Sequence, residues 1–267
     1  MKIGMIGAGN MGSALAAAVS QGQDAPDVYL TDASAARAAE VAQRIGAHVT
    51  DNVSAAETCD ILFLAVKPNV LPGVLGEIRT ALSSRSTACL LVSMAAGVTL
   101  QTIYAHLGGV YPVIRIMPNT PAAIGEGMIL YSVGENVTEA QKTAFVRVLS
   151  AAGELDALPE GWIDAGCAVS GCGPAFVYMM IEAMADGAVE CGLPRDKAQK
   201  YATQTLLGAA KLLASGTLHP GAQKDAVCSP GGSTIAGVHA LEHGAFRATV
   251  MDAVTAAYRK TKELAKN

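Results

Sequence analysis

The sequence predicts an α/β domain with a parallel-rich sheet, followed by an all-helical domain. The first observation is the opening of the chain, where an apolar run, Ile3–Ile6, leads into a glycine-rich turn and then a helical stretch. The second is the alternation of strand-like and helix-like segments up to about residue 155. The third is the loss of strand-like alternation from Ala165 onward. Alternating β and α units imply right-handed crossovers and a doubly wound sheet of the Rossmann type.

The first domain is predicted to span residues 1–155. Its strand-like segments are short and apolar, as strands covered on both faces are, and lie at Lys2–Ile6, Val28–Thr31, Ile61–Ala65, Ala88–Ser93, Val113–Met117 and Met128–Val133. Helices are predicted at Ser13–Val19, Ala33–Ile45, Val70–Leu82, Leu100–Leu107 and Thr138–Ala152. The helix from Ala33 has Asp32 or Ser34 as its N-cap and ends at Gly46.

The second domain, residues 156–267, is predicted to be all α. Its helices are expected at Ala175–Cys191, Asp196–Ser215, Gly221–Val227, Thr234–Glu242 and Phe246–Leu264. The segment Ala175–Ile181 is apolar all round. A helix without a polar face is buried on every side or pairs with another subunit, which favours an oligomer.

Composition narrows the class of protein. Of 267 residues, 51% are hydrophobic and 16% are charged, and the net charge is −4. An acidic chain argues against nucleic acid as the main partner. We find no signal peptide and no run near the roughly 20 apolar residues of a membrane span. The six cysteines form no C-x-x-C pair, so we interpret them as reduced core residues of a cytoplasmic protein.

The glycine-rich turn has the order of a dinucleotide site: strand, turn, helix. In such a site Gly7 allows the tight turn, Gly9 lets a pyrophosphate approach the backbone, and Gly12 lets the helix pack on the strand. The helix N-terminus offers unpaired N–H groups and a partial positive charge to phosphate. The predicted cofactor-binding turn comprises Gly7, Ala8, Gly9, Asn10, Met11 and Gly12.

Two residues after the second strand bear on the choice of cofactor. Asp32 stands where the ribose-binding acid of an NAD site is expected, and it is equally placed to cap the next helix. Arg37 either holds the 2′-phosphate of NADP or points into solvent. This chemistry alone leaves NAD and NADP unresolved.

Further candidates follow the next two strands, because ligands of open α/β sheets collect beyond the carboxyl ends of strands. Lys67 is either near the nicotinamide ribose or exposed in a turn. Pro68 begins the next helix. The small residues of Ser93–Gly97 leave room for a flat ring, and the segment Arg115–Ala122 is either a pocket wall or a structural loop.

Two glycine-rich turns open helices in the second half, Ser170–Ala175 and Ser229–Thr234. Both offer N–H groups to a carboxylate; the alternative is ordinary capping by Ser170 and by Ser233 or Thr234. A separate pattern, His239, Glu242 and His243, has the H-x-x-E-H spacing of a zinc peptidase, but such a site needs a third protein ligand.

Five blocks occur in a fixed order along nearly the whole chain: Ile6–Gly12, Ala65–Pro68, Met117–Pro121, Ser170–Ala175, and Ser229–Gly237 followed by Leu241-Glu242. With these blocks the chain resembles the pyrroline-5-carboxylate reductase family, which makes proline. The resemblance implies a Rossmann domain, a helical dimerisation domain, and a homodimer that is sometimes assembled into rings. It also implies NADPH as the preferred cofactor, with NADH as the other choice.

Carried over residue by residue, the resemblance assigns the rest of the cofactor groove to Asn52, Ala65, Val66, Lys67, Pro68, Ala95 and Ala96. The substrate carboxylate is expected on Ser170 and on Ser229, Pro230, Gly231, Gly232, Ser233 and Thr234, with the Thr234 hydroxyl beside the ring nitrogen as the catalytic group. Two departures stand out. Cys172 replaces the more usual Ser, and Asp32, whose carboxylate repels a 2′-phosphate, weakens the expectation of NADPH.

The expected reaction is hydride transfer from NAD(P)H to the C=N bond of 1-pyrroline-5-carboxylate, giving L-proline. Another NAD(P)-dependent imine or hydroxyacid oxidoreductase is the alternative. A hydroxyacid enzyme requires a strong general acid or base in the helical half, and none is found there. A zinc hydrolase using His239, Glu242 and His243 is a remote alternative.

Overall fold

The computed structural model describes residues 1–22 and 26–264 of the chain. It divides into two compact units, which are described separately. Unit 1 comprises Met1–Cys172 together with Ala257–Asn267, and unit 2 comprises Gly173–Ala256.

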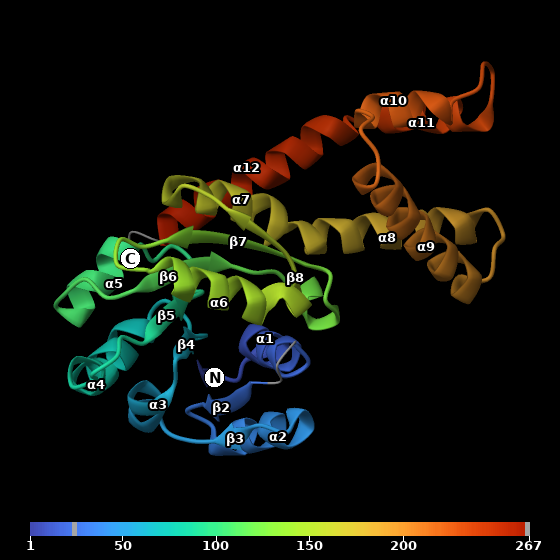
Figure 1. Ribbon diagram of the computed structural model, residues 1–267. Coiled ribbons are helices and arrows are strands. Elements are labelled where there is room, and N and C mark those ends of the chain that lie inside the picture. The colour runs from blue at the N-terminus through green and yellow to red at the C-terminus, as the bar shows by residue number, and fades with distance from the viewer. Residues whose placement is uncertain (23–25, 265–267) are drawn as a thin grey trace. The chain divides into compact units, whose positions relative to one another are not determined.

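Unit 1 is built on one sheet with the strand order β3-β2-β1-β4-β5-β6-β7-β8 (Figure 1). All neighbouring strands are parallel except β6 and β7. The sheet order reverses at β1, which lies between β2 and β4, so a crevice forms beyond the carboxyl ends of these strands. The strands are β1 Lys2–Ile6, β2 Asp27–Thr31, β3 His48–Val49, β4 Ile61–Leu64, β5 Leu90–Ser93, β6 Val113–Met117, β7 Gly127–Val133 and β8 Gly153–Ala157.

Helices cover both faces of the sheet, and successive residues of a central strand such as β4 belong in turn to the cores on the two faces. Phe63 belongs to the core that includes Leu15 and Phe145, whereas its neighbours Leu62 and Leu64 belong to the core on the other face. This explains why the strands are apolar without alternation. The helices are α1 Asn10–Ser20, α2 Ala35–Ile45, α3 Asn52–Thr58, α4 Leu71–Ser83, α5 Leu100–Leu107, α6 Glu139–Leu149 and α7 Ile163–Ser170, with 3₁₀ turns η1 Thr120–Ile124, η2 Ser150–Ala152 and η3 Glu160–Trp162.

Unit 2 is helical and has a small core of its own. Its elements are α8 Gly173–Glu190, α9 Arg195–Ala214, α10 Pro220–Ala226, α11 Ser233–His243 and most of α12 Phe246–Leu264. Its buried core residues are alanines of α8 and α9, namely Ala185, Ala198 and Ala202. Large apolar side chains are exposed in the same unit, among them Met179, Leu212 and Met251, each at least 60% exposed. Exposed apolar surface of this kind marks an interaction face.

The predicted elements of both halves are confirmed, with shifts at their ends. Ser34 rather than Asp32 is the N-cap of α2, and Gly46 ends it with φ +71°. Four of the described strands and α-helices were missed: β3, β8, α3 and α7. β3 is two residues long and β8 is mostly exposed, so neither has the apolar run of a buried strand. The predicted helix Thr138–Ala152 divides into α6 and η2.

Two further observations concern the extent of unit 1 and the cysteines. Compact unit 1 continues past residue 155 to Cys172, because Ile163 and Cys167 of α7 pack against Met117 and Leu130 of the sheet. The division at 155/156 into functional domains stays a prediction. All six cysteines are free, but only three are buried, and Cys191 is exposed, so the interpretation of all six as core residues is wrong.

One stretch of the described residues is long and apolar enough to cross a membrane. It covers Glu160–Glu190, and within it a window of 18 residues has a mean hydropathy of 1.3, with only 11% of that window buried. No such segment was expected from the sequence. Two turn residues, Gly171 and Cys172, separate α7 from α8 within it. A helix that is apolar all round either spans a membrane or pairs with a second subunit when it is not buried within its own chain.

Candidate functional site

The glycine-rich turn lies between β1 and α1, at the carboxyl end of β1. Gly7 has φ +105°, and a Cβ there would meet the backbone of Ala65. A Cβ on Gly12 would meet the Gly7 carbonyl oxygen and, at 3.0 Å, the Ala65 Cβ. A Cβ on Gly9 would stand in open space, with no atom within 4 Å. Gly7 and Gly12 are therefore required by the fold, whereas Gly9 leaves room for a ligand.

This open space fits the phosphate cradle of a dinucleotide. Gly9 is the N-cap of α1 and supplies no side chain to cap its N–H groups. Those groups and the helix dipole favour an anion. The Ser13 hydroxyl donates to the Ala8 carbonyl at 2.8 Å and holds the turn against the helix.

Asp32 closes the other side of this turn, directly after β2. Its Oδ2 accepts the Ala8 N–H at 2.8 Å, and its Oδ1 accepts the Ser34 N–H at 2.8 Å. The carboxylate therefore joins the glycine-rich turn to the start of α2. The Arg37 Nη1 lies 3.8 Å from Asp32 Oδ1, and the Arg37 side chain is 57% exposed.

A cavity of about 510 Å³ lies at this crevice. It is lined by eight of the predicted cofactor residues: Gly7, Gly9, Asp32, Arg37, Asn52, Ala65, Val66 and Lys67. Lys67 and Pro68 also line a neighbouring cavity of about 690 Å³ together with Ala96. Ala8 and Asn10 line a third cavity, of about 570 Å³, which Arg37 shares. Two predicted residues face the core instead: Ala95 is 1% exposed, and Met11 packs against the core.

Sequence reasoning missed other parts of the 510 Å³ cavity, namely Thr31, Asp51 and Glu77. The Thr31 hydroxyl donates to Asn52 Oδ1, and Asn52 Nδ2 donates to Glu77 Oε2 at 2.8 Å. Asp51 caps α3, and hydrogen bonds from Ser54 lower the pKa of its carboxyl. The N-cap pattern of Asp51 and Ser54 was the available signal for this helix.

The loop after β6 is held by structural contacts. Asn119 Nδ2 donates to the Ser170 carbonyl at 2.9 Å, and Asn119 Oδ1 accepts the Met128 N–H at 2.9 Å. Asn119 is 8% exposed. The Ser170 hydroxyl donates to the Gly166 carbonyl within α7. Ser170 is therefore the last residue of α7 and does not cap α8, which begins at Gly173.

The second predicted turn lies in unit 2, at the start of α11. Gly231 has φ +67°, the Gly232 N–H donates to the Ser229 carbonyl at 3.0 Å, and a Cβ on Gly232 would meet the Ser229 hydroxyl. Gly232 is the N-cap and makes no side-chain cap bond, so capping by Ser233 or Thr234 is not what is found. Both residues lie in the exposed first turn of α11. The N–H groups of that turn are suited to a carboxylate.

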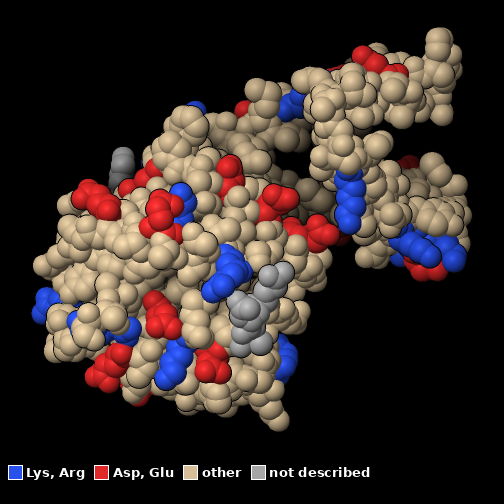
Figure 2. Space-filling model, in the orientation of Figure 1, with Lys and Arg blue, Asp and Glu red and all other residues tan. Residues whose placement is uncertain are grey.

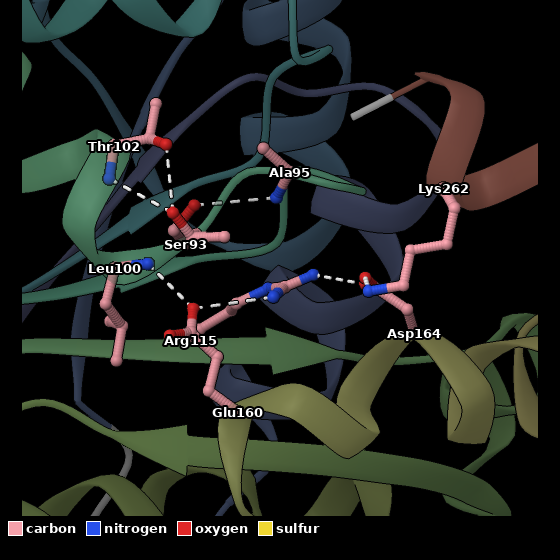
Figure 3. A network of polar contacts seen from close by, with 9 residues as sticks. Ser93, Ala95, Leu100, Thr102, Arg115, Glu160, Asp164 and Lys262 are labelled. Carbon is pink, nitrogen blue, oxygen red and sulfur yellow. Dashed lines mark hydrogen bonds and ion pairs between the residues drawn. The ribbon is translucent and has the colours of Figure 1, made fainter. Parts of the chain in front are cut away.

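An ion network around the buried Arg115, which sequence reasoning also missed, joins β6 to η3, α7 and α12 (Figure 3). Arg115 of β6 is 1% exposed, and its Nη2 donates to Asp164 Oδ1 at 2.6 Å. Lys262 Nζ lies 3.1 Å from the other Asp164 oxygen, and Arg115 Nη1 lies 3.4 Å from Glu160 Oε1. An arginine inside an apolar strand was the available signal, because a buried charge must be paired.

The glutamate of the H-x-x-E-H pattern is engaged in an ion pair. Glu242 Oε1 accepts the Arg247 Nε–H at 2.7 Å, which occupies the residue that a zinc peptidase uses in its site. Among the described residues, no three His, Cys, Asp or Glu side chains lie close enough to hold a metal ion.

Charge is mixed on the face of the molecule that Figure 2 shows. Acidic and basic side chains are interspersed over unit 1, in keeping with the net charge of −4. A surface of this kind differs from the basic stripe of a nucleic-acid-binding protein.

Two family models match this chain. The model for pyrroline-5-carboxylate reductase dimerisation matches residues 160–264. The model described as NADP oxidoreductase, coenzyme F420-dependent, matches residues 2–97. The first covers the segments that carry the exposed apolar surface, and the second covers the glycine-rich turn.

Individual proteins match along the full length. Pyrroline-5-carboxylate reductase of Escherichia coli is 40% identical over 269 residues, covering 100% of this chain and 99% of that protein. The enzyme of Arabidopsis thaliana is 39% identical, covering 100% of this chain and 96% of that protein. The crystal structure of Plasmodium falciparum pyrroline carboxylate reductase with NADP bound is 31% identical and has a TM-score of 0.87, covering 99% of this chain and 98% of that one.

Proposed function

This chain belongs to the pyrroline-5-carboxylate reductase family, and from that membership we infer that it reduces the C=N bond of 1-pyrroline-5-carboxylate with NAD(P)H to give L-proline. The observation that carries this conclusion is the match along the whole length, because it includes both the glycine-rich turn and the turn at the start of α11. A hydroxyacid dehydrogenase or a zinc hydrolase would share at most one of them.

We propose that the crevice of unit 1 holds the dinucleotide. The N–H groups at the start of α1 bind the pyrophosphate, Gly9 leaves the necessary space, and Asp32 and Asn52 line the ribose end of the cavity. Lys67, Pro68 and Ala96 line the adjoining cavity. When bound, the reduced nicotinamide supplies the hydride.

The turn from Ser229 to Thr234 is proposed to hold the substrate. A carboxylate placed at the start of α11 accepts hydrogen bonds from backbone N–H groups and is stabilised by the helix dipole. Gly231, with its positive φ, and Gly232, whose Cβ would meet Ser229, keep these groups free of side chains. Ser170 was assigned to the same task, but its hydroxyl already donates within α7.

Thr234 is proposed to support the ring nitrogen. A protonated imine accepts hydride better than a neutral one, and the product is an amine, so no alkoxide has to be protonated. A hydroxyl that accepts a hydrogen bond from the iminium N–H is sufficient for that purpose. Thr234 lies in the exposed first turn of α11, where its hydroxyl is accessible.

The remaining assignments are proposed on the same basis. The dimerisation match at residues 160–264 and the exposed apolar side chains of unit 2 support a homodimer, and a larger ring is the further assembly that we propose. The exposed apolar stretch Glu160–Glu190 lies within this match, which favours a subunit interface over a membrane. A cytoplasmic enzyme without a nucleic-acid partner fits the charge and the six free cysteines.

The test follows the absorbance of NADPH and NADH with 1-pyrroline-5-carboxylate. We expect Thr234→Ala to lower kcat by roughly tenfold or more, the scale of a lost proton-handling group, while Thr234→Ser retains most of the activity. The cofactor Kd is expected to be the same in both variants. Wild-type kcat in Thr234→Ala would remove Thr234 from the mechanism, and no oxidation of either nucleotide would refute the proposed reaction.

A further inference from the structure

The position of the Asp32 carboxylate bears on which dinucleotide the crevice accepts. Asp32 lines the 510 Å³ cavity beside Gly7 and Gly9, and its side chain is 11% exposed. Two backbone N–H groups, those of Ala8 and Ser34, each donate to it at 2.8 Å and fix both of its oxygens. A carboxylate held in this way cannot turn out of the cavity without breaking both bonds.

Each carboxylate oxygen has a second lone pair that these bonds leave free. A carboxylate accepts about four hydrogen bonds, and Asp32 accepts two from the backbone. The remaining lone pairs suit donors, such as the two hydroxyls of a ribose. They repel a phosphate, which has no donor to offer when ionised.

The start of α2, which is the natural place for a 2′-phosphate, is already occupied by side chains. The Ser34 N–H donates to Asp32, and the Arg37 N–H donates to the Ser34 hydroxyl at 3.4 Å. A phosphate placed at this helix start would have to displace the Asp32 carboxylate from the N–H group that it satisfies.

The charges of the side chains that line the cavity also disfavour a 2′-phosphate. Its lining holds three carboxylates, those of Asp32, Asp51 and Glu77, and two cations, Arg37 and Lys67. Hydrogen bonds from Ser54 lower the pKa of Asp51, which keeps it ionised. Arg37 is 57% exposed and lies 3.8 Å from Asp32, so its charge is partly compensated before any ligand arrives.

We propose that Asp32 makes this enzyme select the non-phosphorylated dinucleotide, NADH, against NADPH. The proposal rests on the proposed function, since it concerns the cofactor of that reaction. It sets this chain apart from the relative whose crystal structure has NADP bound. The physical basis is the hydrogen bond of Asp32 to ribose hydroxyls and its repulsion of a 2′-phosphate.

The experiment measures binding separately from turnover. The purified protein without substrate is titrated calorimetrically with NADH, NADPH, NAD⁺ and NADP⁺. In the wild type we expect each non-phosphorylated form to bind at least roughly tenfold tighter than its phosphorylated partner, a difference of about 1.4 kcal/mol. In Asp32→Ser this ratio is expected to fall to about one or to reverse.

Asp60→Asn is the matched control. Asp60 also accepts a backbone N–H, that of Lys2 at 2.8 Å, but it lies at the amino ends of β1 and β4, away from the crevice. The ratio of dissociation constants should stay at the wild-type value in this variant. Arg37→Ala tests the alternative that Arg37 holds the 2′-phosphate of NADPH. In that case NADPH would bind this variant more weakly than the wild type, while the affinity for NADH would stay the same.

Each outcome decides the proposal. The proposal is overturned if the wild type binds the phosphorylated forms equally well or more tightly. It is also overturned if Asp32→Ser still unfolds cooperatively and its ratio of dissociation constants is that of the wild type. If Asp32→Ser does not fold, the wild-type ratio and its response to Arg37→Ala decide alone. Absence of binding by all four nucleotides overturns both this proposal and the cofactor site. Tight NADPH binding with reduction of 1-pyrroline-5-carboxylate would refute only the selectivity and leave the proposed function intact.

Discussion

Gly9→Ala should separate the folding role of the glycine-rich turn from its binding role. Gly9 has φ −69° and ψ −176°, an extended conformation that alanine adopts without strain. Its added Cβ would have no atom within 4 Å. We therefore expect the free energy of unfolding to stay the same or to rise by up to about 1 kcal/mol, because alanine restricts the unfolded chain.

Binding of the dinucleotide should respond in the opposite direction. The methyl group would fill the open space that the pyrophosphate is proposed to use, and it would push the phosphate away from the N–H groups of α1. A hydrogen bond to a charged group contributes about 1.5–3 kcal/mol. Loss of one such bond raises the Kd of the cofactor by roughly tenfold to a hundredfold.

The assay pairs urea unfolding with calorimetric titration of NADH. Gly76→Ala is the control, since Gly76 is an exposed residue of α4 whose Cβ would also stand in open space, and its cofactor Kd should not change. Gly12→Ala is the contrast, because its Cβ would meet the Gly7 backbone, and overpacking should lower the free energy of unfolding by about 1–3 kcal/mol. A Gly9→Ala protein that binds NADH like the wild type, or that is as unstable as Gly12→Ala, would refute the reasoning.

Two further predictions concern stability. Asp164→Ala leaves the buried Arg115 without its 2.6 Å partner, and we expect the free energy of unfolding, measured with urea, to fall by roughly 3–5 kcal/mol. When Arg115→Leu is already present, the same substitution should lower the free energy of unfolding much less. Equal losses in the two backgrounds would contradict the pairing. Burial raises the pKa of Cys89 to about 12 and that of Cys167 to about 11, from 9.0. The folded state thus holds protons that the unfolded state releases, so stability is complete below about pH 9 and declines as pH rises towards 11. The urea midpoint of the wild type, measured in a reductant, should be lower at about pH 10 than at about pH 8. The double variant Cys89→Ala with Cys167→Ala should show a smaller drop in the midpoint between these two pH values. A drop as large as that of the wild type would exclude these thiols as its cause.

Much of the fold was predictable because its signals are local. The apolar runs and the glycines predicted the positions of several elements correctly, namely β1, β6, α5 and α12. These elements are bounded by residues that act on the chain beside them, such as Gly108, which ends α5 with φ +71°. Short or exposed elements such as β3 and β8 have no such signal, since their backbone partners are distant in the chain.

The candidate site divides in the same way. The residue types of the glycine-rich turn and of Ser229–Thr234 predicted anion-binding helix starts, and the structure has helices beginning at both places. Of the two N-caps that the sequence left open for α2, the structure has Ser34, and Asp32 accepts the Ser34 N–H instead. The bond from the Ala8 N–H to Asp32 joins residues that follow neighbouring strands, and only the pairing of β1 with β2 brings them together.

The sequence by itself determined the order of most strands and helices, the three glycine positions of the turn and the family of the chain. These depend on residues close together in the chain or on motifs in a fixed order. Only the tertiary structure decided which groups meet: Arg115 with Asp164 and Lys262, or Asn52 with Thr31 and Glu77. Such contacts depend on strand order and on burial, because a charge removed from water takes whichever partner the packed chain brings within reach.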